Sequence, residues 1–183
     1  MRQRFAPSPT GLLHIGHAFS AVTAWRAAQS AKGEFLLRIE DIDQPRCKPE
    51  FEQAIFDDLH WLGLSWVEPV MRQSERMPVY KRTLNRLAVM GLCYPCRCTR
   101  RDIAAALSAP QEGQEPEFGP DGLIYPGTCS HRPMSDKADS DAVRLSMARA
   151  IDCLGGASEV EKLCYVETGS GTEETIHLSA ESL

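Results

Sequence analysis

Two histidines and a glycine mark the point where an expected strand gives way to an expected helix. They are His14, Gly16 and His17, and they follow a Pro-Ser-Pro-Thr-Gly run at 7–11 that continues neither a strand nor a helix. A helix that begins at the carboxyl end of a parallel strand presents free N–H groups and the positive end of its dipole. The turn therefore suits a bound phosphate with imidazole donors beside it. Alternatively, the histidines only cap the helix.

Clustered cysteines are a second candidate for chemistry. The chain has seven cysteines, an odd number, and Cys96 and Cys98 are too close to form a disulfide framework. Together with Cys129 they offer thiolates for a tetrahedral zinc site. Tyr125 and His131 compete for the fourth position, since zinc chemistry alone prefers imidazole to phenol. Reduced cysteines with no metal are the remaining alternative.

The elements that would position these residues alternate between strand and helix. Strands are expected at 2–6 and 34–40, the second as an apolar strand buried on both faces. Helices are expected at 17–31 and from Pro49 to just before Gly63. This order predicts a βαβ unit and hence a parallel sheet of the dinucleotide-binding type.

The rest of the chain indicates shorter elements. A third helix is expected from an N-cap at Ser74 to Gly91, and a short helix at 102–107 with Thr99 as its cap. The composition further predicts a flexible loop at 108–122 and antiparallel strands at 142–147, 163–167 and 175–178.

Charge and hydropathy limit the partners. The net charge of the 183 residues is −5, but segment 72–101 alone carries +7, which leaves −12 for the remainder. This segment could follow a nucleic-acid backbone or could be a solvated helix face. No apolar run approaches the length of a membrane span, and no signal peptide is evident. We therefore expect a cytoplasmic protein with no membrane partner.

Residues 4–17 as a whole resemble the first signature of class I aminoacyl-tRNA synthetases in their glutamate-specific form. Residues 38–43, 61–64, 73–74 and Tyr80 are similar to further landmarks of bacterial glutamyl-tRNA synthetases, and still more to those of the shorter glutamyl-Q tRNA(Asp) synthetases. The resemblance implies an α/β, Rossmann-like class I synthetase fold with a zinc-bearing insertion.

The resemblance also implies where ATP binds. His14, Gly16 and His17 would hold the nucleotide, and both imidazoles would donate hydrogen bonds to the α-phosphate in the transition state. Mg²⁺ is expected on the pyrophosphate.

Glutamate carries one ammonium and two carboxylates, so its site needs an anion and at least one arginine. The ends of neighbouring strands place Arg4 and Glu40 over one sheet edge, Arg4 for a carboxylate and Glu40 for the ammonium. The implied glutamate-binding residues are Arg4, Phe5, Ala6, Pro7, Ser8 and Glu40. From residue types alone, Arg4 and Glu40 could instead form a structural ion pair.

For the metal, the resemblance favours Cys96, Cys98, Tyr125 and Cys129 as zinc ligands, although the loop between the two halves of this pattern is longer than in the family. A Cys-x-His pattern found in some glutamyl-tRNA synthetases keeps His131 as a competitor.

Three functions are compatible with these features. The first is ATP-dependent activation of glutamate and its transfer to the queuosine base of tRNA(Asp), which Ala-Phe-Ser-Ala at 18–21 favours. The second is the amino-terminal part of an enzyme that charges tRNA(Glu), and the third is a non-catalytic tRNA-binding remnant.

Three segments are expected: half of the nucleotide fold at 1–92, a zinc-binding insertion at 93–135 and antiparallel strands at 136–183. None of the five lysines lies in the lysine-serine-lysine pattern of the family's second half. The sequence thus predicts that the second half of the fold is missing and that this chain alone cannot complete activation. The complete enzyme is expected to be a monomer.

Overall fold

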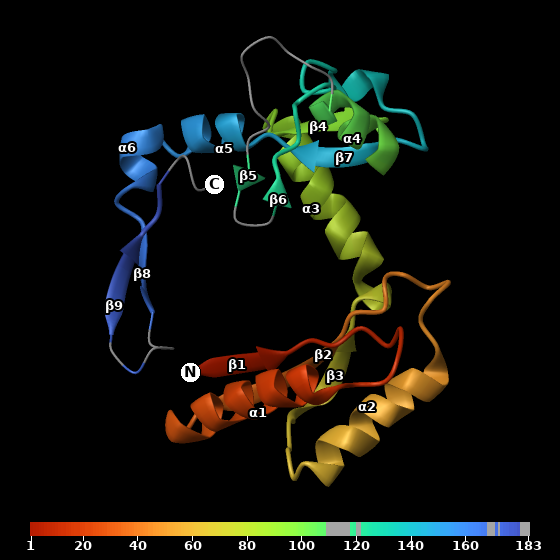
Figure 1. Ribbon diagram of the computed structural model, residues 1–183, viewed down its shortest axis with the longest axis vertical. Helices are drawn as coiled ribbons and strands as arrows, with labels where there is room; N and C mark the ends of the chain where they lie inside the picture. The colour runs from red at the N-terminus through yellow and green to blue at the C-terminus, as the bar shows by residue number, and fades with distance from the viewer. Residues whose placement is uncertain (109–117, 120–121, 168–170, 172, 180–183) are drawn as a thin grey trace. The chain divides into compact units, whose positions relative to one another are not determined.

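The computed structural model describes residues 1–108, 118–119, 122–167, 171 and 173–179 (Figure 1). The chain divides into two compact units, Met1–Arg82 and Thr83–Leu183. In the described part of the chain, no helix combines the length and the apolar character that a membrane crossing requires.

The first unit contains the predicted parallel sheet. Its strands are β1 (Arg2–Phe5), β2 (Glu34–Ile39) and β3 (Val67–Arg72), in the order β1-β2-β3. Helix α1 (Ile15–Ser30) connects the first two strands, and α2 (Pro49–Trp61) connects the second and third. The βαβ prediction is therefore confirmed, with α1 beginning two residues earlier than expected.

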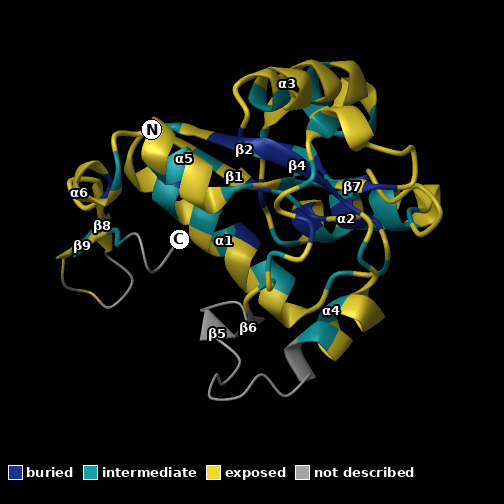
Figure 2. Cartoon of the chain, turned by 90° about the horizontal axis from the view of Figure 1, so that it is seen from above, coloured by how far each residue is buried: buried dark blue, intermediate teal, exposed yellow. Residues whose placement is uncertain are grey.

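The core of this unit is built from one face of β2. Phe35, Leu37 and Ile39 are buried there, whereas Leu36 and Arg38 on the other face are only half-buried (Figure 2). The prediction that the strand is buried on both faces was therefore wrong. The buried face packs with apolar residues of the neighbouring elements, namely Phe5, Ala21, Ala28, Ile55, Leu59 and Leu64.

Strand β3 was not predicted from the sequence. Pro69 interrupts it, and its first three residues are exposed. Proline lacks a backbone N–H and is tolerated on edge strands, which is the position that β3 occupies among the described strands. The apolar signal that identifies a buried strand is therefore missing here.

A buried carboxylate joins the ends of β2 and β3. Asp41 accepts hydrogen bonds from the backbone N–H of Ser74 at 2.8 Å and from its hydroxyl at 2.5 Å. Burial alone would raise the pKa of Asp41, but the bonds from Ser74 outweigh it and lower the pKa. Ser74 begins a short 3-10 helix, Ser74–Arg76, which leads into α3 (Met77–Val89). The predicted third helix is present, but the prediction that Ser74 is its N-cap was wrong. The α-helix begins at Met77, and the Ser74 hydroxyl donates to Asp41 instead of capping the helix.

The second unit is built from short elements. Strand β4 (Cys93–Cys96) pairs antiparallel with β7 (Ala142–Leu145), and β8 (Cys164–Glu167) pairs antiparallel with β9 (Glu174–His177). The three strands expected after residue 142 are thus confirmed. The unit also contains α4 (Arg100–Ser108), β5 (Phe118–Gly119), β6 (Gly122–Leu123), the 3-10 helix Met134–Asp136, α5 (Met147–Cys153) and α6 (Ala157–Val160).

Helix α4 has the expected cap at Thr99 but begins at Arg100, two residues earlier than expected. Thr99 Oγ1 accepts a hydrogen bond from the backbone N–H of Asp102, and the Asp102 carboxylate accepts one in return from the Thr99 N–H. Helices α5 and α6 were not predicted, because seven and four residues are too few to establish a helical period. Most of the loop expected at 108–122 lies outside the described residues.

Replacing Asp41 by asparagine should lower the free energy of unfolding by about 1 kcal/mol at pH 7, because a charge-assisted acceptor becomes a neutral one. The pKa of Asp41 is lowered in the folded state, so its contribution is present above the unfolded pKa of about 3.9 and is lost as the pH falls through the folded value. Urea unfolding of both proteins at pH 7 and below pH 4 should show the difference shrinking.

The exposed neighbour Asp43 supplies the control. Asp43→Asn should change the free energy of unfolding by less than about 0.5 kcal/mol. A difference between wild type and Asp41→Asn that stayed constant over the whole pH range would contradict the role given to the carboxylate.

Candidate functional site

The turn between β1 and α1 is held by backbone hydrogen bonds. The carbonyl of Pro7 accepts from the N–H of Glu40 at 2.9 Å, and the carbonyl of Pro9 accepts from the N–H of Lys48 at 3.0 Å. Both prolines are buried. The turn is therefore fixed against the segment that follows β2.

A pocket of about 270 Å³ lies on this turn. It is lined by residues 5–8, 10–13 and His17. Four of the predicted glutamate-binding residues, Phe5, Ala6, Pro7 and Ser8, therefore line one cavity together with one of the two histidines.

His14 and His17 form the start of α1. His14 is the N-cap, and its Nδ1 accepts a hydrogen bond from the Gly16 N–H at 3.1 Å. The Nδ1 of His17 accepts one from the His14 N–H at 3.2 Å. Because a nitrogen that accepts cannot carry the ring proton, each neutral imidazole carries it on Nε2. The histidines therefore do cap the helix, as one reading of the sequence allowed. Among the described residues, none accepts a hydrogen bond from Nε2 of either ring.

Gly16 is needed for this arrangement. A Cβ atom at this position would lie 3.0 Å from Cε1 and 3.2 Å from Nδ1 of His14. A side chain there would push the imidazole away from the N–H group that it caps. The glycine thus makes room for the His14 ring.

Glu40 forms an ion pair, but with Arg38 and not with Arg4. Arg4 is exposed and makes no ion pair with any residue that the structure describes. The parallel register aligns Arg4 with Leu36, so Glu40 lies about 13 Å further along the sheet. By the alternation of side chains along a strand, Arg4 and Glu40 lie on the same face of the sheet.

Arg38 was not predicted from the sequence as the partner of Glu40. The available signal was the spacing of two residues, since alternate residues of a strand point to the same face. Arg38 is half-buried and fixes the orientation of the carboxylate.

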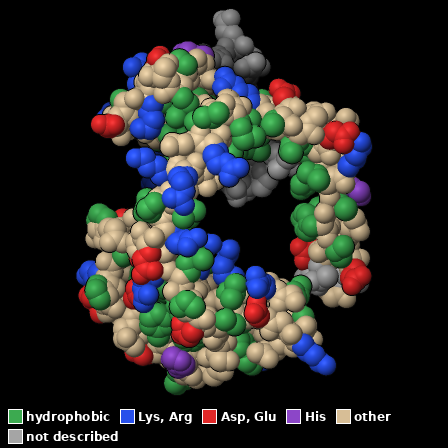
Figure 3. Space-filling view, turned by 180° about the vertical axis from the view of Figure 1, so that it is seen from behind, with side chains coloured by type: hydrophobic (Ala, Val, Ile, Leu, Met, Phe, Trp, Pro, Cys, Tyr) green, Lys and Arg blue, Asp and Glu red, His purple; other side chains and the backbone are tan. Residues whose placement is uncertain are grey.

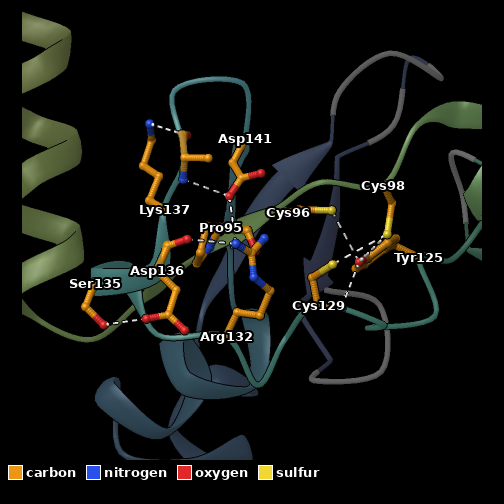
Figure 4. A network of polar contacts seen from close by, with 11 residues as sticks. Pro95, Cys96, Cys98, Tyr125, Cys129, Arg132, Ser135, Asp136, Lys137 and Asp141 are labelled. Carbon is orange, nitrogen blue, oxygen red and sulfur yellow. Dashed lines mark hydrogen bonds and ion pairs between the residues drawn. The ribbon is translucent and has the colours of Figure 1, made fainter.

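Three sulfur atoms converge in the second unit. The Sγ atoms of Cys96, Cys98 and Cys129 all lie within 4.8 Å of one another (Figure 4). The Tyr125 hydroxyl is 3.3 Å from the sulfur of Cys96 and 3.6 Å from that of Cys98, and 3.5 Å separates the Cys98 and Cys129 sulfurs. Tetrahedral zinc with its usual bond lengths would separate such ligand atoms by about 3.5–3.8 Å. The four side chains therefore fit a zinc ion.

His131, the competing fourth ligand, lies elsewhere. It is exposed, and its ring nitrogens do not belong to the group of ligand atoms that the described residues bring together. Tyr125 also accepts a hydrogen bond from the Cys129 N–H at 3.0 Å, which fixes the hydroxyl at the cluster.

The environment of Cys96 favours the form that binds metal. Burial by itself raises the pKa of this thiol, but hydrogen bonds from Tyr125 and Arg144 outweigh burial and lower the pKa to about 6. The thiolate is the metal-binding form of cysteine. Burial and the hydrogen bonds with Cys96 and Cys98 raise the pKa of Tyr125, a shift that a bound cation would reverse.

Arg132 holds the two halves of the cluster together. Its guanidinium donates to the carbonyls of Pro95 and Asp136 and to the Asp141 carboxylate, the last at 2.9 Å (Figure 4). Pro95 immediately precedes Cys96, and Arg132 follows Cys129 by three residues. No motif in the sequence marked this arginine.

Most of the basic residues of segment 72–101 are exposed, and Figure 3 shows Lys and Arg side chains gathered in groups on the surface. Arg72 is an exception, because its guanidinium donates to the Glu52 carboxylate at 2.8 Å. The exposed members are Arg76, Lys81, Arg82, Arg86, Arg97, Arg100 and Arg101.

Comparison with known proteins identifies the class. Residues 1–118 match the catalytic domain of class I tRNA synthetases of the E and Q type, and the chain belongs to this family. In structure, 100% of this chain aligns with the glutamate tRNA ligase of Elizabethkingia meningosepticum, with a TM-score of 0.63 and 23% sequence identity. The aligned part makes up 37% of that ligase chain. At this identity the likeness establishes the α/β fold of class I synthetases.

Curated relatives give a narrower comparison. The chain is 55% identical over 150 residues to the glutamyl-Q tRNA(Asp) synthetase of Rhodobacter capsulatus, covering 80% of this chain and 53% of the relative. It is 44% identical over 138 residues to that of Rhodopirellula baltica, covering 75% and 42%. A glutamate–tRNA ligase of Synechococcus is 46% identical over 119 residues, covering 64% and 25%. The chain spans about half the length of these relatives or less.

The capping role of His14 predicts a contrast between two substitutions. His14→Ala removes the acceptor for the Gly16 N–H and should lower the free energy of unfolding by about 1 kcal/mol. Asparagine is among the best N-cap residues, so His14→Asn should stay within about 0.5 kcal/mol of wild type. Urea unfolding of the three proteins measures both values, and equal stability of the alanine and asparagine variants would contradict the cap.

Proposed function

We propose that this chain serves the activation of glutamate with ATP and the transfer of the glutamyl group to the queuosine base of tRNA(Asp). The observation that carries this proposal is the pocket on the β1–α1 turn, with two histidines whose Nδ1 atoms are engaged by backbone N–H groups. The chain is 44–55% identical to two relatives named glutamyl-Q tRNA(Asp) synthetase. These names support the choice of substrate.

In this proposal the α-phosphate of ATP lies at the start of α1. A glutamate carboxylate oxygen attacks the α-phosphorus, and pyrophosphate leaves. The Nε2–H groups of His14 and His17 donate to the phosphate oxygens, where negative charge accumulates in the transition state. The N-terminus of the helix adds its dipole in the same direction. Mg²⁺ would neutralise the leaving pyrophosphate.

The glutamate would lie over the face that Arg4 and Glu40 share. Arg4 would pair with a carboxylate, and Glu40 would accept hydrogen bonds from the ammonium. The ion pair with Arg38 holds Glu40 in one orientation before the substrate arrives. Ala6 and Ser8 line the pocket, and the Ala6 carbonyl and Ser8 hydroxyl would complete the site.

The cluster of Cys96, Cys98, Tyr125 and Cys129 would hold one structural Zn²⁺. The distances between ligand atoms and the lowered pKa of Cys96 support this assignment. The exposed basic residues of segment 72–101 supply positive charge for a tRNA backbone. Charging of tRNA(Glu) is the second candidate, which the similarity to the Synechococcus ligase supports.

Transfer assays on the complete gene product test the function. With ATP and labelled glutamate, label should appear in tRNA(Asp) that contains queuosine and not in tRNA(Asp) that lacks it. Label on the terminal adenosine of tRNA(Glu) would instead establish the second candidate. Label on neither tRNA, together with no pyrophosphate exchange, would contradict both.

The same preparation tests the assignment of Glu40. Glu40→Gln should lower the rate of glutamate-dependent pyrophosphate exchange about 30- to 160-fold, because the ammonium loses a charged partner worth about 2–3 kcal/mol. The matched control is Glu50→Gln, an exposed carboxylate on α2, which should retain the wild-type rate. Wild-type exchange by Glu40→Gln would remove Glu40 from the site.

The metal assignment predicts one zinc ion per chain. Elemental analysis of protein purified without chelators should find it in wild type and in His131→Ala. Tyr125→Phe keeps the ring but removes the hydroxyl that lies 3.3 Å from Cys96 Sγ, so it should hold zinc more weakly. A zinc-free native protein would refute the centre, and loss of zinc only in His131→Ala would give the fourth position to His131.

A further inference from the structure

Strand pairing brings Arg144 to the sulfur cluster. In the antiparallel pair of β4 and β7, Arg144 lies opposite Tyr94. Side chains of directly opposed residues point to the same face, and Cys96, two residues after Tyr94, points there too. Cys96 is therefore a diagonal neighbour of Arg144, within reach of a long side chain.

The contacts of the Arg144 guanidinium are with two members of the cluster. Its Cζ atom lies 4.1 Å from the centre of the Tyr125 ring. The Cys96 sulfur is also a neighbour, and its interaction with the guanidinium raises the pKa of Arg144. Its Nε atom is buried without a hydrogen-bond partner. Buried donors without partners are uncommon. The ring and the sulfur therefore decide where this side chain lies.

The negative charge of the ligand set explains why a neighbouring arginine would matter. Three thiolates and a phenolate carry more negative charge than Zn²⁺ neutralises. Arg132 also reaches the cluster, but its charge is paired with Asp141 at 2.9 Å. Within the part of the chain that the structure describes, no carboxylate pairs with Arg144. Arg144 is thus a cation whose charge is available to the cluster.

We propose that Arg144 is a positioning residue of the metal centre, which holds the Tyr125 ring and stabilises the phenolate and the Cys96 thiolate as ligands. The inference rests on the proposed zinc centre. A planar guanidinium can stack on a ring and donate to a neighbouring sulfur at the same time, which the ammonium of lysine cannot do. Residues that orient metal ligands in this way typically change metal affinity by about 10–100-fold when they are replaced.

Zinc affinity and the state of Tyr125 test the proposal together. Affinity is measured by competition with a chromophoric chelator, and deprotonation of Tyr125 by the ultraviolet difference spectrum of tyrosinate on zinc loading, with Tyr125→Phe as the blank. Arg144→Gln should bind zinc about 10–100-fold more weakly and lose most of the tyrosinate signal. Arg144→Lys should fall between this variant and wild type. The control, Arg149→Gln on α5, replaces an exposed arginine that donates to the Gly91 carbonyl and should match wild type.

The outcomes separate the two proposals. A wild-type protein that binds no zinc would refute the metal centre itself. If wild type binds zinc but Arg144→Gln and Arg144→Lys match Arg149→Gln in affinity, Arg144 has no role at the metal. Weaker binding with a full tyrosinate signal would show that Arg144 only supports the fold, and would also overturn the proposal. So would zinc binding by wild type without any tyrosinate signal.

Discussion

Two backbone hydrogen bonds fix the geometry on which the candidate site depends. Pro7 and Pro9 offer their carbonyls to the N–H groups of Glu40 and Lys48. Proline has no N–H and a restricted φ, so this turn is stiff and cannot extend β1. The bonds hold the turn against residues 40–48, the segment between β2 and α2, which places the pocket, the start of α1 and Glu40 in one region. A phosphate and an amino acid bound there would be neighbours without further rearrangement of the backbone.

The cysteine cluster in the second unit is also held by contacts between segments that are distant in the sequence. Cys96 lies at the end of β4, whereas Tyr125 and Cys129 come from a segment about 30 residues later. The β4–β7 pairing and the Arg132 bonds to the Pro95 and Asp136 carbonyls hold these segments together. The donor atoms are thus gathered at separations that suit zinc, and the metal would lock an arrangement that the protein already favours.

Local patterns predicted only part of this structure. Apolar residues in β2, and Pro49 and Gly63 at the ends of α2, gave those elements correctly, because their signals lie within a few residues. Strand β3 was not predicted because it is an edge strand that contains Pro69 and has no buried face whose apolar residues would indicate a strand. The partners of Glu40 and Cys96 also could not be read reliably from the sequence. Glu40 pairs with Arg38, two residues before it in the chain, and not with Arg4 on the neighbouring strand. Arg144 lies near Cys96 because the strand register places it opposite Tyr94.

The central claim is that the β1–α1 turn binds the phosphate of an activated glutamate. A crystal structure of the complete gene product with a non-hydrolysable glutamyl-adenylate analogue tests it most directly. The account predicts the phosphate, or the group that replaces it, within hydrogen-bond distance of Nε2 of His14 and His17, and the glutamate ammonium at the Glu40 carboxylate. An analogue bound away from this turn, or one whose phosphate group contacts neither imidazole, would contradict it.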